Sequence, residues 1–286
     1  MIILKDVARP GPSRWQSSRW GSWRVGPNVV LALTIVVFLA VWEVVSRLSL
    51  VDPTFISRPT AVIAAIPEMA RDPKTQDALA TTGASIAWAI FYGTVAGIVS
   101  GYILGTVRVL RDAFYGPAVF LMSVPKSIFI PIFMVVFGIN TQSAVYYGAF
   151  SGFIFVLINV IGGLDLLEEK HLRIATAYGA NWRHRIVDII FPASLPGVFT
   201  GIWYGIKNGL QGILIFELFM SVGGLGGWMR LNTNLLRTDR IFAIVLGVSI
   251  VSILLGEGWS LIERRLNRWR PASTATAIVN TEQQSG

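Results

Sequence analysis

Five polar or ionisable side chains within the long apolar stretches of this sequence are its first candidates for chemistry. They are Lys126, Lys207, Asn208, Gln211 and Glu217. A charged group among apolar residues is costly to bury, so it usually faces a partner or an aqueous path. The two lysines therefore favour a pathway for an anionic solute. Snorkelling to a membrane surface, or a structural ion pair, is the alternative.

Spacing along a helix separates these candidates into two faces. At 100° per residue, Lys207, Asn208 and Gln211 fall within an arc of about 100°. Glu217 lies roughly 280° round from Lys207 and belongs to a different face. One carboxylate deep in a predicted span gives little support for a proton or sodium relay.

Signatures of catalysis are missing from the sequence. It has no cysteine, which excludes a disulfide framework, a thiolate metal site and a cysteine nucleophile. It has no G-x-x-x-x-G-K-[ST] phosphate loop, and the glycine-rich run 223–227 lacks the residues that would complete one. Neither H-E-x-x-H nor G-x-S-x-G occurs. We therefore expect no enzyme, no metal site and no cofactor bound by this chain.

The composition indicates the kind of element that must position these side chains. Hydrophobic residues make up 53% of the 286 positions and charged residues only 14%, against about 25% in an ordinary soluble domain. The mean hydropathy is +0.60. So much apolar surface cannot be hidden in one soluble core, and the sequence predicts an all-α, polytopic membrane bundle.

Six segments are long and apolar enough to cross a bilayer, which requires roughly 20 helical residues. No charged residue occurs between positions 127 and 164, which is too long a run for one crossing, so we divide it at the turn-forming residues 138–142. The third segment also contains Pro117, Pro125 and Pro131, which remove helical hydrogen bonds. The predicted spans are 29–50, 83–106, 114–139, 143–163, 195–222 and 241–262.

The basic residues predict the orientation of the bundle. With the N-terminus inside, fifteen lysines and arginines lie in cytoplasmic segments and six in outer segments, so both termini are expected in the cytoplasm. These anchors account for the net charge of +8 without nucleic acid. We divide the chain into a basic, Trp-rich cytoplasmic arm (1–27), a membrane domain (28–270) and a disordered cytoplasmic tail (271–286).

A glycine recurs at every fourth position of the second predicted span. The stripe consists of Gly93, Gly97, Gly101 and Gly105. Small residues at this spacing let a neighbouring helix approach closely. The stripe indicates either ordinary close packing or a seam along which two helices slide.

The segment 164–194, between the fourth and fifth predicted spans, is expected to form two short amphipathic helices on the cytoplasmic face. Gly179 suits the end of the first helix and Asn181 can cap the second. Pro192 and Pro196 then mark the return to the membrane. This arrangement favours a docking site for another protein, with an interfacial helix lying on lipid as the alternative.

The same segment resembles the EAA loop of the permease subunits of ABC importers. Arg173-Ile174-Ala175 is followed by Gly179, four residues after Ala175, and then by Ile189-Ile190-Phe191-Pro192. Residues 28–270 as a whole resemble the binding-protein-dependent branch that serves nitrate, aliphatic sulfonates, taurine, bicarbonate and pyrimidine precursors. The likeness includes Pro59, Pro125, Pro131, Gly138, Glu217 and the stretches 224–226 and 237–239.

This resemblance implies a type I ABC importer permease fold in the bacterial inner membrane, in contact with membrane lipid. It implies a separate cytoplasmic ATPase that binds ATP with Mg, a periplasmic or lipid-anchored binding protein, and a permease homodimer. The substrate would be a small anion or small organic solute such as a sulfonate, taurine, nitrate or a pyrimidine precursor. The residues that would couple the permease to the ATPase are Arg173, Ala175, Ala177, Tyr178, Gly179, Ala180, Trp182 and Pro192.

Two departures from the family pattern stand out. Arg173 occupies the place of the usual glutamate, which reverses a charge, and Lys126 and Lys207 are not expected at their positions. Two rival functions remain open at this point: a self-sufficient secondary transporter and, with less support, a membrane-embedded enzyme.

Overall fold

The computed structural model describes residues 27–52, 54–167, 174–175 and 177–266, and their regular elements are all helical. The predicted N-terminal arm and C-terminal tail lie outside the described residues, apart from Pro27. The elements are α1 (Pro27–Arg47), α2 (Pro59–Arg71), α3 (Pro73–Thr106), α4 (Arg108–Ser123), the 3-10 turn η1 (Lys126–Phe129), α5 (Ile130–Phe137), α6 (Thr141–Asp165), α8 (Trp182–His184), the π-helical turn η2 (Arg185–Ile190), α9 (Phe191–Met220), α10 (Gly224–Asn234) and α11 (Thr238–Leu266).

The six predicted spans reappear with one important difference. In the described part of the chain, five helical segments are long and apolar enough to cross a membrane. The third predicted span, 114–139, is instead a pair, α4 followed by η1 and α5, bent by 103°. Val124 takes an extended conformation (φ −74°, ψ 135°) before Pro125, because the proline ring disfavours helical geometry in the residue that precedes it. The predicted segment 114–139 is therefore interrupted at Pro125, and the count reaches the predicted six when the bent pair is taken as one span.

Two helix boundaries also differ from the predicted ones. α3 begins at Pro73, ten residues before the predicted start, because the Asp72 side chain caps it by accepting a hydrogen bond from the Lys74 amide at 3.1 Å. The fifth predicted span, 195–222, also begins earlier than predicted, because residues 182–220 form one continuous helical run. The π-helical turn η2 lies just before Pro192. Its wider hydrogen-bonding pattern makes room for the proline ring, which would clash with the preceding turn of a regular α-helix.

α3, α6 and α9 form the centre of the bundle, and they approach one another closely. A Cβ atom built on Gly93 would lie 2.7 Å from the carbonyl oxygen of Ala149 on α6. One built on Gly152 of α6 would lie 2.7 Å from the carbonyl oxygen of Gly205 on α9. Glycine at both positions therefore sets the helix separation. The other glycines of the stripe on α3 also face α6: Gly97, Gly101 and Gly105 lie against Val156, Val160 and Leu164.

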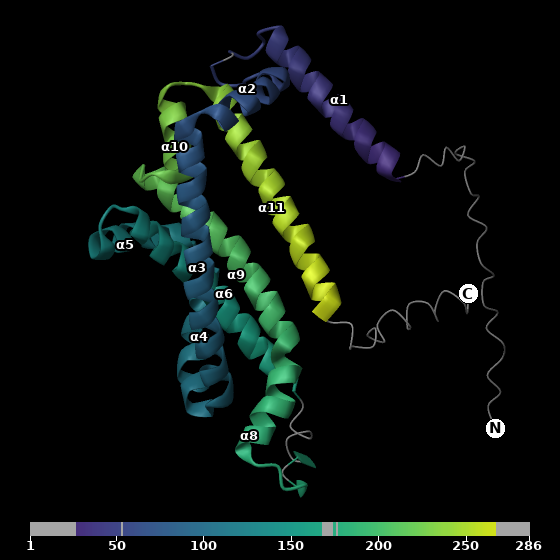
Figure 1. Ribbon diagram of the computed structural model, residues 1–286, viewed down its shortest axis with the longest axis vertical. Coiled ribbons are helices and arrows are strands. Elements are labelled where there is room, and N and C mark those ends of the chain that lie inside the picture. Colours follow the sequence, from purple (N-terminus) through teal and green to yellow (C-terminus); the bar gives the residue numbers. More distant parts are fainter. Residues whose placement is uncertain (1–26, 53, 168–173, 176, 267–286) are drawn as a thin grey trace, which may run out of the picture.

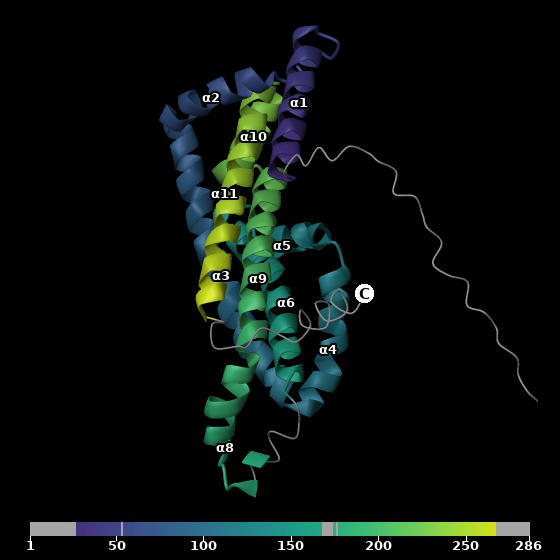
Figure 2. The same cartoon turned by 90° about the vertical axis from the view of Figure 1, so that its right-hand side faces the viewer.

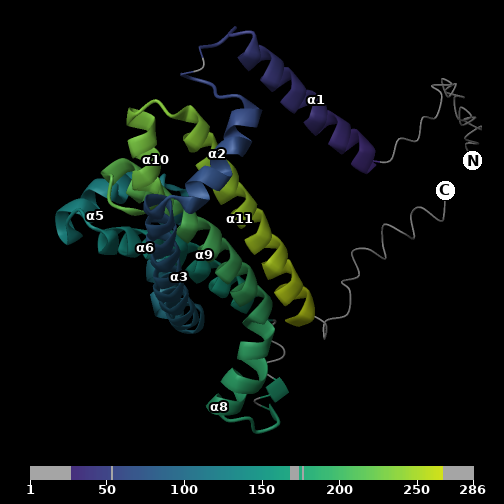
Figure 3. The same ribbon diagram turned by 45° about the horizontal axis from the view of Figure 1, so that its top comes forward.

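The short helices lie at opposite ends of the long ones. α2 and α10 gather at one end of the bundle and α8 lies at the other (Figures 1 and 2). α1 diverges from the bundle over most of its length (Figure 3). Its C-terminal end is held by Glu43, whose carboxylate accepts from Arg47 at 2.7 Å and from the Thr60 amide and hydroxyl at 3.1 and 2.9 Å.

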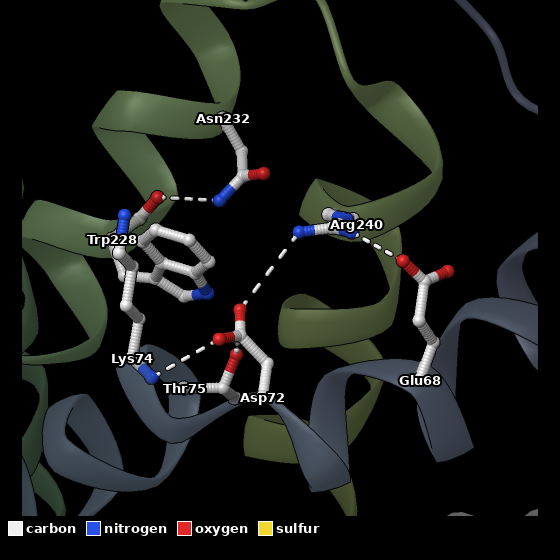
Figure 4. A network of polar contacts seen from close by, with 7 residues as sticks. All are labelled: Glu68, Asp72, Lys74, Thr75, Trp228, Asn232 and Arg240. Carbon is white, nitrogen blue, oxygen red and sulfur yellow. Dashed lines mark hydrogen bonds and ion pairs between the residues drawn. The ribbon is translucent and has the colours of Figure 1, made fainter.

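A polar network joins the helices at the α2–α10 end (Figure 4). The Arg240 guanidinium, at the start of α11, pairs with Glu68 on α2 at 2.5 Å and lies 4.0 Å from Asp72. Because Asp72 also caps α3, one arginine connects three helices. The network fixes this end of the molecule, while the centre is held by apolar packing.

Candidate functional site

The break between α4 and α5 opens a pocket with a largely polar lining. Its volume is about 360 Å³. It is lined by segments from α4 to η1, from α6 and from α9, which meet only because the chain turns at Pro125. The polar lining residues are Ser123, Lys126, Ser127, Tyr147, Ser151, Asn208 and Gln211.

Lys126 supplies the charge in this pocket. Its Nζ atom lies 4.4 Å from the centre of the Phe155 ring, and Phe155 in turn stacks on Tyr204. A ring face attracts a cation but does not neutralise it. No carboxylate of the described residues lies within ion-pair distance of this ammonium group. Lys126 therefore presents an uncompensated positive charge to a polar space.

Asn208 and Gln211 of α9 lie one helical turn apart on the same wall. Asn208 donates one amide hydrogen to the Tyr204 carbonyl oxygen at 2.9 Å, which leaves its second N–H for the pocket. The wall stands close to α6 because residue 212 is a glycine, where an added Cβ would lie 2.8 Å from the Ser151 oxygen. Of the five residues singled out by type, the structure brings together these two and Lys126.

Lys207 does not line this pocket. Its side chain is exposed, and its Nζ lies 5.8 and 5.7 Å from the ring centres of Trp203 and Tyr204. Neighbouring positions on a helix point about 100° apart, so Lys207 and Asn208 face different surroundings. The role of Lys207 in a pathway stays a prediction.

Glu217 also lies elsewhere, in a buried cluster that joins α3, α9 and α10. Its side chain is 1% exposed and accepts hydrogen bonds from the Thr82 hydroxyl at 2.8 Å and the Gly226 amide at 3.1 Å. The Leu225 amide donates to the Thr82 oxygen at 2.7 Å. Glu217 therefore forms hydrogen bonds that hold helices together, and it does not line the pocket.

Sequence reasoning missed the hydroxyl groups of the pocket and the partner of Glu217. Ser123, Ser127, Tyr147, Ser151 and Thr82 lie in apolar segments, and small hydroxyl residues are common in membrane helices. The one available signal was the four-residue spacing of Tyr147 and Ser151, which places both on one face of α6.

The loop expected to dock a partner has the predicted turn at its tip. Gly179 adopts φ +80°, and the Ala180 amide donates to the Ala175 carbonyl oxygen at 3.0 Å, which closes the first helical turn. Asn181 caps the following helix by accepting from the His184 amide at 3.0 Å, as predicted. Arg173 lies outside the described residues.

Two aromatic side chains beside this turn are largely exposed. Tyr178 is 89% exposed and Trp182 is 74% exposed. Exposed aromatic residues on a tight turn are typical of a surface that another protein covers. Ala177 is also exposed here, and Pro192 lies at the start of α9, where the run enters the bundle.

Comparison with known proteins gives consistent similarities over most of the chain. Residues 93–269 match the family described as binding-protein-dependent transport system inner membrane component. The chain is 26% identical over 280 residues to the taurine transport system permease protein of Escherichia coli K12, covering 94% of this chain and 98% of that one. It is 25% identical over 266 residues to a putative aliphatic sulfonates transport permease protein of Bacillus subtilis 168, covering 93% of each. A riboflavin transport system permease protein of Chloroflexus aurantiacus is 24% identical over 163 residues, which cover 57% of this chain and 61% of that protein.

Proposed function

This chain belongs to the family of binding-protein-dependent transport system inner membrane components, and from that premise we propose that it forms the pathway of an ATP-driven importer for small sulfonate-like anions. It is a multi-pass permease subunit of the inner membrane and acts with a separate ATPase and a binding protein. The proposed substrate class follows the names of two relatives, which refer to transport of taurine and of aliphatic sulfonates.

The polar pocket at the α4–α5 break carries this proposal. A solute that crosses a bilayer through helices needs polar groups at depth, and backbone irregularity is tolerated there only beside protein or water. The pocket supplies a lysine, two amides and four hydroxyl groups where the helix is interrupted. Its positive charge fits an anion.

A homodimer would place this pocket in a shared pathway. Ser123, Ser127 and Gln211 are exposed on the single chain, so the pocket opens on the surface of the subunit. A second copy packed against that surface would enclose it. Helices with apolar exposed faces, such as α1 and α5, would then contact lipid or the other copy.

The turn at Gly179 is the proposed contact with the ATPase. It lies at the end of the bundle opposite α2 and α10 (Figure 2). We assign that end, and both termini, to the cytoplasm, and the α2–α10 end to the side where a binding protein delivers substrate. Residues 182–220 form one helical run from this turn into the bundle. Movement of the ATPase would therefore reach the pocket wall at Asn208 directly.

The test is reconstitution in liposomes with the cognate ATPase and binding protein. We expect uptake of a labelled alkanesulfonate or of taurine that requires ATP and both partners. Uptake that persists without the ATPase and follows a proton or sodium gradient would instead identify a secondary transporter. The engagement of Glu217 with Thr82 and Gly226 argues against such a relay.

A further inference from the structure

We propose that the pocket at the α4–α5 break selects organic monoanions with an uncharged apolar body, and that the Lys126 ammonium binds their sulfonate or carboxylate head. This inference rests on the proposed function and narrows it. It assigns part of the substrate selectivity to the permease itself.

The charge balance of the pocket points to a single anionic group. Lys126 is the one charged residue among the lining residues, none of which is an aspartate or glutamate. Its ammonium lies on the Phe155 ring, and no acidic side chain of the described residues pairs with it. An ammonium group in a partly desolvated site gains from a charge-assisted hydrogen bond. A ligand with one negative charge would supply the partner that the protein lacks.

Neutral donors surround the lysine. The hydroxyl groups of Ser127 and Ser151 and the amides of Asn208 and Gln211 line the same space. They can donate to the two or three oxygen atoms of a carboxylate or sulfonate. The lining contains no arginine, whose fork would hold the anion bidentately. Binding by one ammonium and neutral donors is weak enough to release a solute in transit, as conduction requires.

The remaining lining is apolar and accommodates the body of the solute. Met122, Val124 and Ile215 contribute side chains without charge or hydrogen-bonding groups. An alkyl chain gains free energy by leaving water against such a surface. The ammonium of a zwitterion such as taurine would find no carboxylate in this lining, and an unpaired buried charge is unfavourable. The pocket should therefore prefer an alkanesulfonate to taurine.

The experiment measures binding of radiolabelled butanesulfonate to the permease–ATPase complex in nanodiscs, without the binding protein. We expect saturable binding that Lys126→Met weakens roughly ten- to a hundredfold, the loss of one hydrogen bond to a charged group. Lys126→Arg should bind no more than about threefold more weakly than the original, because the guanidinium keeps the charge and can donate to the anion. Lys207→Met is the matched control and should bind unchanged, since its side chain lies on Trp203 and Tyr204, outside the pocket.

Competition defines the ligand class. Butanoate should displace butanesulfonate, whereas taurine should require at least a tenfold higher concentration and a neutral butyl amide should not compete. Unchanged affinity in Lys126→Met, or no binding by the original complex at millimolar butanesulfonate, would overturn the site. Equal competition by taurine would overturn the selectivity for an uncharged body.

Uptake separates this inference from the proposed function. Liposomes with the complete transporter should import butanesulfonate at a rate that falls in Lys126→Met, while ATP hydrolysis stimulated by the loaded binding protein persists. If import is equally fast in Lys126→Met, the proposed binding site at Lys126 is wrong, while the proposed function still stands. Failure of the original transporter to import any sulfonate, with its stimulated ATP hydrolysis intact, removes the proposed substrate class.

Discussion

The Glu217 carboxylate on α9 accepts a hydrogen bond of 2.8 Å from the Thr82 hydroxyl on α3, across 135 positions of sequence. The same carboxylate accepts from the Gly226 amide, so it also fixes the start of α10. The space is tight: a Cβ atom added to Gly226 would lie 2.5 Å from that of Glu217. A buried carboxylate with several donors holds three helices together at the α2–α10 end.

Removal of this carboxylate should destabilise the bundle. Glu217→Leu leaves the Gly226 amide and the Thr82 hydroxyl without an acceptor, at a cost of about 1–3 kcal/mol for each buried donor left unsatisfied. We expect a lower midpoint in thermal unfolding of the purified protein in detergent. Glu257→Leu, at an exposed position of α11, should leave the midpoint nearly unchanged.

A double-mutant cycle tests whether the two residues act as a pair. If they do, Thr82→Val combined with Glu217→Leu should lower the midpoint by less than the sum of the single effects. Strict additivity would show that Glu217 contributes through the backbone of α10 and that the bond to Thr82 carries no coupling.

The glycine stripe offers a second matched comparison. Gly93→Ala should destabilise the protein, because the new Cβ would lie 2.7 Å from a backbone oxygen of α6 and the helices would have to separate. Gly83→Ala in the same helix has no atom within 4 Å of its Cβ and should be neutral or stabilising by up to about 1 kcal/mol. Thermal midpoints of the two variants in the same detergent provide the measurement. A fall of equal size in both would mean that α3 responds to backbone effects and not to contact with α6.

The number and order of the membrane helices were predictable from hydropathy because each helix is a long apolar run. The three prolines and the lysine marked the third span as irregular, but its 103° bend was not predictable. A proline specifies where a helix is interrupted, whereas packing against other helices decides the angle. The early start of α3 did have a signal, since Asp72-Pro73 is a common way to begin a helix.

The site was predictable in part for a related reason. Lys126, Asn208 and Gln211 stood out because polar residues in apolar segments are rare. The position of Lys207 depends on which face of α9 meets α6, and glycines at 205 and 212 decide that face through tertiary contact. The buried role of Glu217 depends on Thr82, whose hydroxyl resembles any other in a membrane helix until the fold is known.

The turn at Gly179 yields a prediction about coupling. Gly179→Asp should abolish binding of the ATPase, because it adds bulk and a negative charge at an exposed turn. The backbone there is in the left-handed region, which favours glycine. Gly179→Asn has nearly the same size, tolerates positive φ and carries no charge, so it should weaken binding about tenfold at most. Co-purification of the ATPase with each variant provides the measurement. Retention of the ATPase by Gly179→Asp would count against this turn as its contact.

The orientation of the two ends can be measured directly because the chain contains no cysteine. Ala180→Cys introduces a thiol beside the α8 turn, and Asn234→Cys introduces one on the exposed end of α10, at the opposite end of the bundle (Figure 1). In intact spheroplasts an impermeant maleimide should label position 234 and leave position 180 unlabelled until the membrane is opened. After opening, addition of the ATPase should slow labelling at 180 and leave 234 unaffected, because only the first thiol lies in the proposed contact. Labelling of position 180 in sealed spheroplasts would reverse the assignment of both ends, and with it the side from which substrate enters the Lys126 pocket.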